Sequence, residues 1–344
     1  MSAAAPELPA TPPAPELPAT PPAPQAPHVA EAPASTPGFP GSPAAAPGFP
    51  EAPFSWRLGR RLTQYTRLMR LDRPVGTWLL LWPSLWALWI AGAGKPKPKV
   101  LIVFVLGVVV MRAAGCVIND FADRDIDPYV RRTRDRPLAA RLVSPAEALI
   151  LFTLLIAAAL YLVTRLDEFT VKLACIGALL TISYPFVKRV FPMPQLYLGI
   201  SFGGWAVPMA FAAQIGTLPR VAWVLYIAAV IWAAMYDTIY AMIDREDDIR
   251  IGVKSSAILF ADMDKLLIGV MQAMMLYALY LVGDDMHFGR WFHGGVLAAA
   301  ALFLWQQWLI RRRDPAGCLR AFVNNQYVGL AIFVGILLQY VYKS

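Results

Sequence analysis

Charged side chains are scarce in this chain of 344 residues. Only 16% of the residues are charged and 58% are hydrophobic, whereas roughly a quarter of the residues in soluble domains are charged. This imbalance excludes a string of soluble domains and predicts an integral membrane protein. The net charge of +8 lies between apolar runs rather than in one basic stripe, so we expect no nucleic-acid partner.

Cysteine and nucleotide-binding motifs are also lacking. The three cysteines are far apart and form no CxxC pair or Cys/His cluster, which argues against a disulfide scaffold and a structural zinc site. The sequence contains no G-x-x-x-x-G-K-[ST] loop, so it lacks the nucleotide-binding loop that a nucleotide-driven pump would need. The three histidines lie in the tail or on the predicted outer side, and we expect none of them to be catalytic.

The first 55 residues differ in composition from the rest. They hold 17 of the 30 prolines, and the unit APELPATPP occurs in tandem at 5–13 and 14–22. Proline at this density cannot supply the backbone hydrogen bonds of a packed core. We therefore expect residues 1–55 to form a disordered, partly polyproline-II tail and residues 56–344 to form the folded domain.

Nine apolar runs of spanning or near-spanning length follow this tail. A transmembrane helix needs about 20 apolar residues, and a helix satisfies its own backbone hydrogen bonds in lipid. The sequence therefore predicts an all-α, polytopic membrane bundle of nine transmembrane helices. The runs are 74–93, 100–120, 146–163, 170–186, 196–213, 221–243, 265–282, 292–310 and 321–342.

The distribution of basic residues predicts the orientation of these spans. With the N-terminus in the cytoplasm, 22 of the 31 Lys and Arg residues lie in cytoplasmic segments and eight lie in outer segments. Short cytoplasmic loops carry an excess of Lys and Arg. We therefore expect the N-terminus inside and the C-terminus outside, although the cluster at 95–99 lies on the outer side.

Two acidic clusters end spans on the predicted cytoplasmic side. In the first, NDFADRDID, three oxygen-bearing side chains are spaced by four and four residues. In the second, DTIYAMIDREDD, three carboxylates are spaced by seven and four. At about 100° per residue, each set would lie on one face of a helix. The side chains are Asn119, Asp123, Asp127, Asp237, Asp244 and Asp248.

Carboxylates gathered beside hydrocarbon point to a metal site. Each is costly there, by several kcal/mol, unless it is paired or solvated. Mg²⁺ removes the repulsion among such groups and bridges carboxylates to substrate phosphates. A single cluster is as well explained by solvated loop charges, but two clusters of this spacing on one side favour a diphosphate site. Candidate phosphate-binding bases are Arg131, Arg136, Lys188, Arg189, Arg245 and Lys254.

The two acidic motifs resemble those of the UbiA family of intramembrane aromatic prenyltransferases. Four further segments resemble the bacterial 4-hydroxybenzoate polyprenyltransferase branch of that family. They are RLDRPVGTWLLLWPSLWALW (70–89), RTRDRPL (132–138), YPFVKRVFPMPQLYLG (184–199) and YDTIYAMIDREDDIRIGVKSSAILF (236–260). The resemblance covers about 60–344, and the proline-rich tail has no counterpart in the family.

The resemblance implies a fold and an activity. The fold would be a nine-helix bundle around a cavity, capped on the cytoplasmic side, in the bacterial inner membrane with a periplasmic C-terminus. The activity would transfer a polyprenyl group from polyprenyl diphosphate to the ring carbon ortho to the hydroxyl of 4-hydroxybenzoate. This reaction would depend on Mg²⁺ and belong to ubiquinone biosynthesis.

The resemblance also assigns roles by motif position. They are metal binding for Asn119, Asp123, Asp244 and Asp248; support of the metal ligands for Asp120, Asp127 and Asp237; diphosphate binding for Arg136, Lys188 and Lys254; and acceptor binding for Arg73 or Arg189. The reaction also needs a base for the ring proton, which would be a carboxylate, Asp127 or Asp237, or the released diphosphate.

Other interpretations fit less of the sequence. A family relative could use another aromatic acceptor. A secondary transporter or channel would place ionisable residues near the bilayer midplane, whereas all but Arg112 lie at span ends here. A CDP-alcohol phosphotransferase would show a D-G-x-x-A-R core, which is missing, and nine spans exclude a soluble isoprenyl synthase. Mg²⁺-dependent release of diphosphate distinguishes an enzyme from a transporter.

Overall fold

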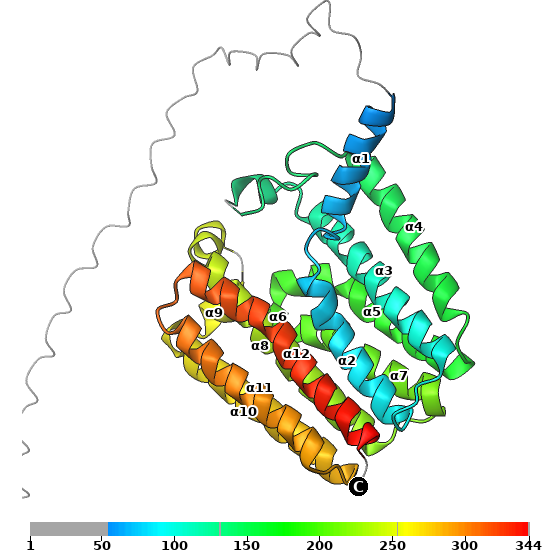
Figure 1. Ribbon diagram of the computed structural model, residues 1–344. Helices are drawn as coiled ribbons and strands as arrows, with labels where there is room; N and C mark the ends of the chain where they lie inside the picture. Colours follow the sequence, from blue (N-terminus) through cyan, green and yellow to red (C-terminus); the bar gives the residue numbers. More distant parts are fainter. Residues whose placement is uncertain (1–53, 131, 253, 343–344) are drawn as a thin grey trace, which may run out of the picture. The chain divides into compact units, whose positions relative to one another are not determined.

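A computed structural model describes residues 54–130, 132–252 and 254–342, and the chain is helical almost throughout these ranges (Figure 1). The described residues contain no strand. The predicted all-α class is therefore confirmed. The predicted tail lies outside the described residues as far as residue 53.

The predicted apolar runs overlap helices in each case. Run 196–213 is divided between two helices by a π-helical turn, Gly199–Gly203. The helices are α1 (Phe54–Leu68), α2 (Val75–Ala91), α3 (Pro98–Ala122), α4 (Pro145–Val163), α5 (Glu168–Val190), α6 (Pro194–Leu198), α7 (Ala206–Ile215), α8 (Arg220–Ile251), α9 (Ser256–Leu259), α10 (Asp264–Asp285), α11 (Arg290–Ile310) and α12 (Pro315–Val341).

The chain is a multi-pass membrane protein. Six helical segments of the described residues are long and apolar enough to cross a membrane, and α2 is apolar but shorter. Large apolar side chains on the outer helices are exposed, among them Leu154 on α4 and Leu304 on α11, as lipid-facing surfaces require. The six segments are 98–122, 145–163, 194–215, 220–250, 261–285 and 315–341. The count of nine spans also needs α2, α5 and α11 and stays a prediction.

The long helices pack as a ring that follows chain order. Contacts run from α2 through α3 and α4 to α5, which contacts both α6 and α7, and these two helices contact α8. From α8 the contacts continue through α10 and α11 to α12, which returns to α2, and α2 also contacts α7 while α12 also contacts α8. Figure 1 shows one side of this ring, with α10, α11, α12, α2, α3 and α4 as successive neighbours. Helices from the two halves of the sequence are thus in direct contact, and each half contributes one acidic motif.

Aromatic packing joins the ring where α12 meets α2. Trp86 and Trp232 are fully buried with ring centroids 5.1 Å apart. The Trp86 indole N–H donates to the Gly329 carbonyl oxygen at 3.1 Å, and that of Trp232 donates to Asn325 Oδ1 at 3.0 Å. Buried indoles need such partners, so these bonds fix α2 and α8 against α12.

Small residues let the π-helical turn approach α8 closely. A Cβ atom at Gly199 would lie 2.6 Å from the Val230 carbonyl oxygen, and one at Gly204 would lie 2.8 Å from Val230 Cγ2. Small residues commonly allow such close approach between membrane helices. This contact sets the position of α8, which carries the second acidic motif.

We expect Gly199→Val to lower the free energy of unfolding by about 1–3 kcal/mol, because the added side chain meets rigid backbone. Gly107→Val is the matched control, since no atom lies within 4 Å of a Cβ at that position. Thermal unfolding of both variants in detergent measures the difference. Equal melting temperatures would contradict this account of the packing.

Candidate active site

The first acidic motif straddles the end of α3. Asn119 lies in the last turn of α3, and Asp123 caps the helix by donating its backbone N–H to the Asn119 carbonyl oxygen. The side chains also meet, because Asn119 Nδ2 donates to Asp123 Oδ2 at 3.1 Å. The prediction that these two oxygen-bearing side chains are neighbours is confirmed.

The prediction that Asp127 continues the same helical face is wrong. Helix α3 ends at Ala122, and Asp127 begins a separate 3₁₀ turn, Asp127–Tyr129. The residue before a proline is disfavoured in the α conformation, and Pro128 follows Asp127 directly. Asp127 therefore belongs to the loop that connects α3 to α4.

The second motif lies on one uninterrupted helix, as predicted. Asp237, Asp244 and Asp248 all belong to α8. Asp237 lies seven residues before Asp244, or about 10 Å along the axis. Asp237 stays partly accessible, although its neighbours Tyr236 and Thr238 are buried.

Two arginines neutralise the buried carboxylates of the first motif. Asp120 is only 1% exposed, and Arg70 Nη2 contacts both its carboxylate oxygens at 3.0 Å. Arg136 Nη1 lies 3.1 Å from Asp120 Oδ1 and 2.8 Å from Asp127 Oδ2. Buried charges persist only when paired in this way. Arg136, predicted to bind diphosphate, therefore also holds the α3–α4 loop against α3.

Burial is the largest influence on the pKa values of Asp127 and Arg70, the residues of this network that lie outside the membrane spans. Burial raises the pKa of the Asp127 carboxyl, and the charge and hydrogen bond of Arg136 oppose this rise. Burial likewise lowers the pKa of Arg70, with Asp120 opposing. Thr133 Oγ1 donates to the Asp127 carbonyl oxygen at 2.9 Å and fixes the backbone. The role of Asp127 in removing a proton stays a prediction.

A second arginine of the same loop crosses to the other motif. Arg132 donates to Asp244 through Nε at 2.8 Å and through Nη2 at 2.5 Å. Its Nη1 also donates to Tyr240 Oη at 2.8 Å. Partial burial acts to lower the pKa of Arg132, but the hydrogen bond and charge of Asp244 raise it above its usual value. Arg132 and Arg136 thus bind opposite motifs from one loop.

The remaining predicted bases are dispersed. Lys254 Nζ donates to the Val190 carbonyl oxygen at 3.1 Å, at the C-terminus of α5. The Arg73 side chain is 80% exposed and lies 3.8 Å from the Asp72 carboxylate. The side chains of Lys188 and Arg189 lie outside the described part of the chain. The predicted roles of these four residues stay predictions.

Arg112 is a site residue to which the sequence analysis gave no role. It lies two helical turns before Asn119 on α3, and a Cβ at Gly76 would lie 2.5 Å from its Nη2 atom. The Arg112 guanidinium donates to Cys116 Sγ and interacts electrostatically with Asp237. A charged residue within a span is by default a functional candidate, so its depth in the membrane was the available signal.

Aromatic rings border the same region. Tyr184 on α5 interacts electrostatically with both Asp123 and Asp237. Its ring packs edge-on to Phe202 with centroids 5.8 Å apart and stacks on Tyr197 at 6.5 Å. Aromatic faces attract cations. Only the fold, which packs α5 against α3 and against the π-helical turn that carries Phe202, indicates this role for Tyr184.

The donor atoms of the motifs suit Mg²⁺. Among the described residues, no group of three or more His, Cys, Asp and Glu side chains is arranged to hold a metal ion. Mg²⁺ does not need such a protein cage, because it binds through one or two carboxylates plus phosphate oxygens and waters. Asn119 and the aspartates supply oxygen donors only, and the pairing of Asp244 with Arg132 shows that Asp244 already accommodates a cation.

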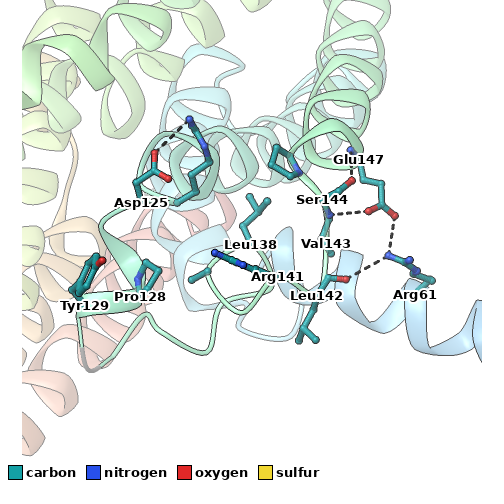
Figure 2. A pocket seen from close by; sticks show the side chains of 13 residues that line it. Arg61, Asp125, Pro128, Tyr129, Leu138, Arg141, Leu142, Val143, Ser144 and Glu147 are labelled. Atoms are coloured by element: carbon teal, nitrogen blue, oxygen red, sulfur yellow. Dashed lines mark hydrogen bonds and ion pairs between the residues drawn. The ribbon is translucent and has the colours of Figure 1, made fainter. Parts of the chain in front are cut away.

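A separate cavity of about 720 Å³ is lined by the α3–α4 loop, α1 and the start of α4 (Figure 2). Arg61 crosses its edge from α1 to Glu147 at the start of α4, at 3.0 Å. Figure 2 shows Arg141 among Leu138, Leu142 and Val143. No predicted metal or diphosphate ligand lines this cavity. We therefore place the candidate active site between the two acidic motifs and not in this cavity.

Comparison with known proteins identifies the family. Residues 80–342 match the UbiA prenyltransferase family. The chain belongs to this family. Among curated UbiA relatives, 4-hydroxybenzoate octaprenyltransferase of Nitrosococcus oceani is 56% identical over 281 residues, covering 82% of this chain and 98% of the relative. The enzyme of the same name from Coxiella burnetii (strain CbuK_Q154) is 53% identical over 283 residues, with the same coverage.

Solved structures share the UbiA fold. The apo UbiA homologue from Aeropyrum pernix K1 superimposes with a TM-score of 0.67 at 23% identity, covering 76% of this chain and 97% of that chain. A UbiA homologue from Archaeoglobus fulgidus, bound to GPP and Mg²⁺, gives 0.60 at 18% identity, covering 80% and 99%. At these identities the likeness establishes the fold.

We expect Asp120→Asn to lower the free energy of unfolding by about 3–5 kcal/mol, because it removes the carboxylate that pairs with Arg70 and leaves Arg136 with Asp127 as its acidic partner. Asp125→Asn is the control, since the Asp125 side chain is 79% exposed and its loss should change stability by at most about 0.5 kcal/mol. Thermal unfolding without Mg²⁺ isolates the structural effect. A stability loss equal to that of the control would show that the network is not structural.

Proposed function

We propose that this chain transfers a polyprenyl group from polyprenyl diphosphate to the ring carbon ortho to the hydroxyl of 4-hydroxybenzoate, in ubiquinone biosynthesis. The observation that carries the proposal is the pair of acidic motifs at the ends of α3 and α8, bridged by arginines of one loop. Two relatives above 50% identity, both named 4-hydroxybenzoate octaprenyltransferase, support the choice of substrates.

Mg²⁺ is the proposed cofactor. Asn119, Asp123, Asp244 and Asp248 would hold it, because they carry the oxygen donors at the two helix ends. When bound, it would neutralise charge on the leaving diphosphate. The Archaeoglobus fulgidus structure with GPP and Mg²⁺ supports this chemistry for the fold.

The bases of this chain would bind the diphosphate. Arg136, Lys188 and Lys254 are the proposed contacts, and Arg132 adds a fourth because it lies between the motifs. A guanidinium fork binds phosphate oxygens in pairs. Charge that develops as the C–O bond breaks would therefore meet preorganised donors.

Aromatic and apolar side chains would shield the allylic cation. Tyr184 and Phe202 border the acidic motifs and would face the cation with their rings. The electron-rich carbon ortho to the acceptor hydroxyl then attacks, and Asp237 would accept the ring proton on a carboxylate oxygen. Asp127 is the other proposed base.

The acceptor carboxylate needs a cationic partner within the bundle. Arg112 fits this need, because it lies about 10 Å before Asn119 along the axis of α3 and its guanidinium lies against Gly76 of α2. This separation leaves room for an aromatic ring between the diphosphate and Arg112. Arg73 and Arg189 remain proposed contacts nearer the membrane surface.

We also propose the topology implied by the sequence. Nine helices would surround the substrate cavity, and the α3–α4 loop would cap it on the cytoplasmic side. The distribution of Lys and Arg supports a cytoplasmic N-terminus and a periplasmic C-terminus in the bacterial inner membrane.

We expect membranes that contain this protein to convert radiolabelled 4-hydroxybenzoate and a polyprenyl diphosphate into a lipid-extractable product only with Mg²⁺. Asp123→Ala and Asp244→Ala should each lose at least about a hundredfold in kcat, because the diphosphate then leaves without charge neutralisation. Extracted label measures turnover, and unchanged membrane insertion is the control.

If only another aromatic acid gives a product, the chain would still act as a prenyltransferase of this family, but with a different acceptor. Folded protein that neither forms product nor releases diphosphate would favour the transporter interpretation. Wild-type rates from either Asp variant would overturn the metal site.

We expect Arg112→Gln to raise KM for 4-hydroxybenzoate about tenfold or more, because a charged hydrogen bond to the acceptor is lost. The KM for polyprenyl diphosphate and the turnover of 4-hydroxybenzamide, which lacks the carboxylate, should change little. Arg165→Gln is the control, since the Arg165 side chain contacts Tyr161 near the end of α4. Equal losses with both acceptors would show that Arg112 acts on structure instead.

A further inference from the structure

Arg132 is bound to the carboxylate of Asp244, which is also a proposed ligand of the metal. Both oxygens of Asp244 accept hydrogen bonds from the guanidinium, with Oδ1 at 2.8 Å from Nε and Oδ2 at 2.5 Å from Nη2. The Asp244 side chain is only 12% exposed. A cation that binds Asp244 must therefore displace Arg132 or share its oxygens.

Tyr240 makes this contact specific. Its hydroxyl accepts from Arg132 Nη1 at 2.8 Å, and the guanidinium carbon lies 4.9 Å from its ring centroid. Tyr240 and Asp244 are four residues apart on α8 and therefore lie on the same face of the helix. Both contact the planar guanidinium of Arg132. Arg132 is thus held in the position of a cation between the two motifs.

The loop anchors around Arg132 are independent of this contact. Thr133 is held by the Asp127 carbonyl oxygen, and Arg136 is held by Asp120 and Asp127. The Arg132 side chain is 35% exposed. It can therefore leave Asp244 by rotating about its own side-chain bonds while the loop backbone stays in place.

We propose that Arg132 and Mg²⁺ exchange on Asp244. The guanidinium neutralises Asp244 until Mg²⁺ binds, and it then turns to the diphosphate that arrives with the metal. Arg132 is accordingly a competitor of the metal and a positioning residue for the substrate. The inference rests on the proposed function only for the identity of that diphosphate.

This exchange makes metal binding and stability depend on Arg132 in a defined direction. Without metal, removing the guanidinium leaves Asp244 unpaired in a poorly solvated position, so the protein should be less stable. With the competitor removed, Mg²⁺ should bind more tightly and restore more stability than in the wild type. A residue that merely supported the metal site would weaken Mg²⁺ binding when removed.

The test uses the full chain in detergent, with Mg²⁺ alone as the probe and no substrate. Calorimetric titration should give Arg132→Gln a Kd for Mg²⁺ about tenfold or more below that of the wild type. The melting temperature of Arg132→Gln should fall in EDTA and recover with Mg²⁺. Arg134→Gln is the matched control, because Arg134 lies in the same loop, its side chain is 64% exposed and it pairs with the neighbouring Asp135.

A second pair of variants keeps the test decisive if Arg132→Gln fails to fold. Arg132→Lys retains the charge but not the planar guanidinium fork. Its Mg²⁺ affinity should therefore lie between that of the wild type and that of Arg132→Gln. In EDTA, Arg132→Gln combined with Asp244→Asn should be no less stable than Arg132→Gln alone. Unchanged or weaker Mg²⁺ binding in both Arg132 variants would overturn the exchange.

The outcome is separable from that of the proposed function. Tighter Mg²⁺ binding in Arg132→Gln supports the exchange even if the wild type prenylates no 4-hydroxybenzoate. Conversely, wild-type prenyl transfer together with weaker Mg²⁺ binding in Arg132→Gln would keep the function and refute the exchange.

Discussion

Compensation of carboxylate charge at the ends of two membrane helices is the constraint on which this structure depends. Asp120 and Asp127 are buried and Asp244 nearly so, and each is met by a guanidinium. Unpaired, these groups would cost several kcal/mol each. Arg132 and Arg136, four residues apart in one loop, satisfy both motifs. The loop is therefore held across the bundle by the same charges that a diphosphate site requires.

The rest of the bundle keeps the two motifs at a fixed separation. The packed indoles of Trp86 and Trp232 fix α2 and α8, and the glycines of the π-helical turn let α6 and α7 approach α8. Rigid helices are better supports for a reactive geometry than loops are. The flexible partners in the site are long arginine side chains, which suits a site that must admit a metal and a phosphate.

Much of the fold and part of the site were predictable from local pattern. Asn119 and Asp123 were expected to be neighbours and are, because both lie within one turn at the end of α3. Asp127 was misplaced because α3 ends at Ala122 and Asp127 begins a separate 3₁₀ turn. Arg112 was noticed but given no role, since nothing in the sequence shows that α2 and α8 approach it.

The sequence by itself determined the membrane class, the helical runs and the two acidic motifs, because hydrophobic length and helical spacing are local properties. Only the tertiary structure decided which base meets which acid. Sequence analysis assigned Arg136 to substrate and gave Arg132 no role, yet one binds Asp120 and Asp127 and the other binds Asp244. Arg132 and Asp244 are 112 residues apart, so their pairing depends on how the helices pack, and no local pattern contains that information.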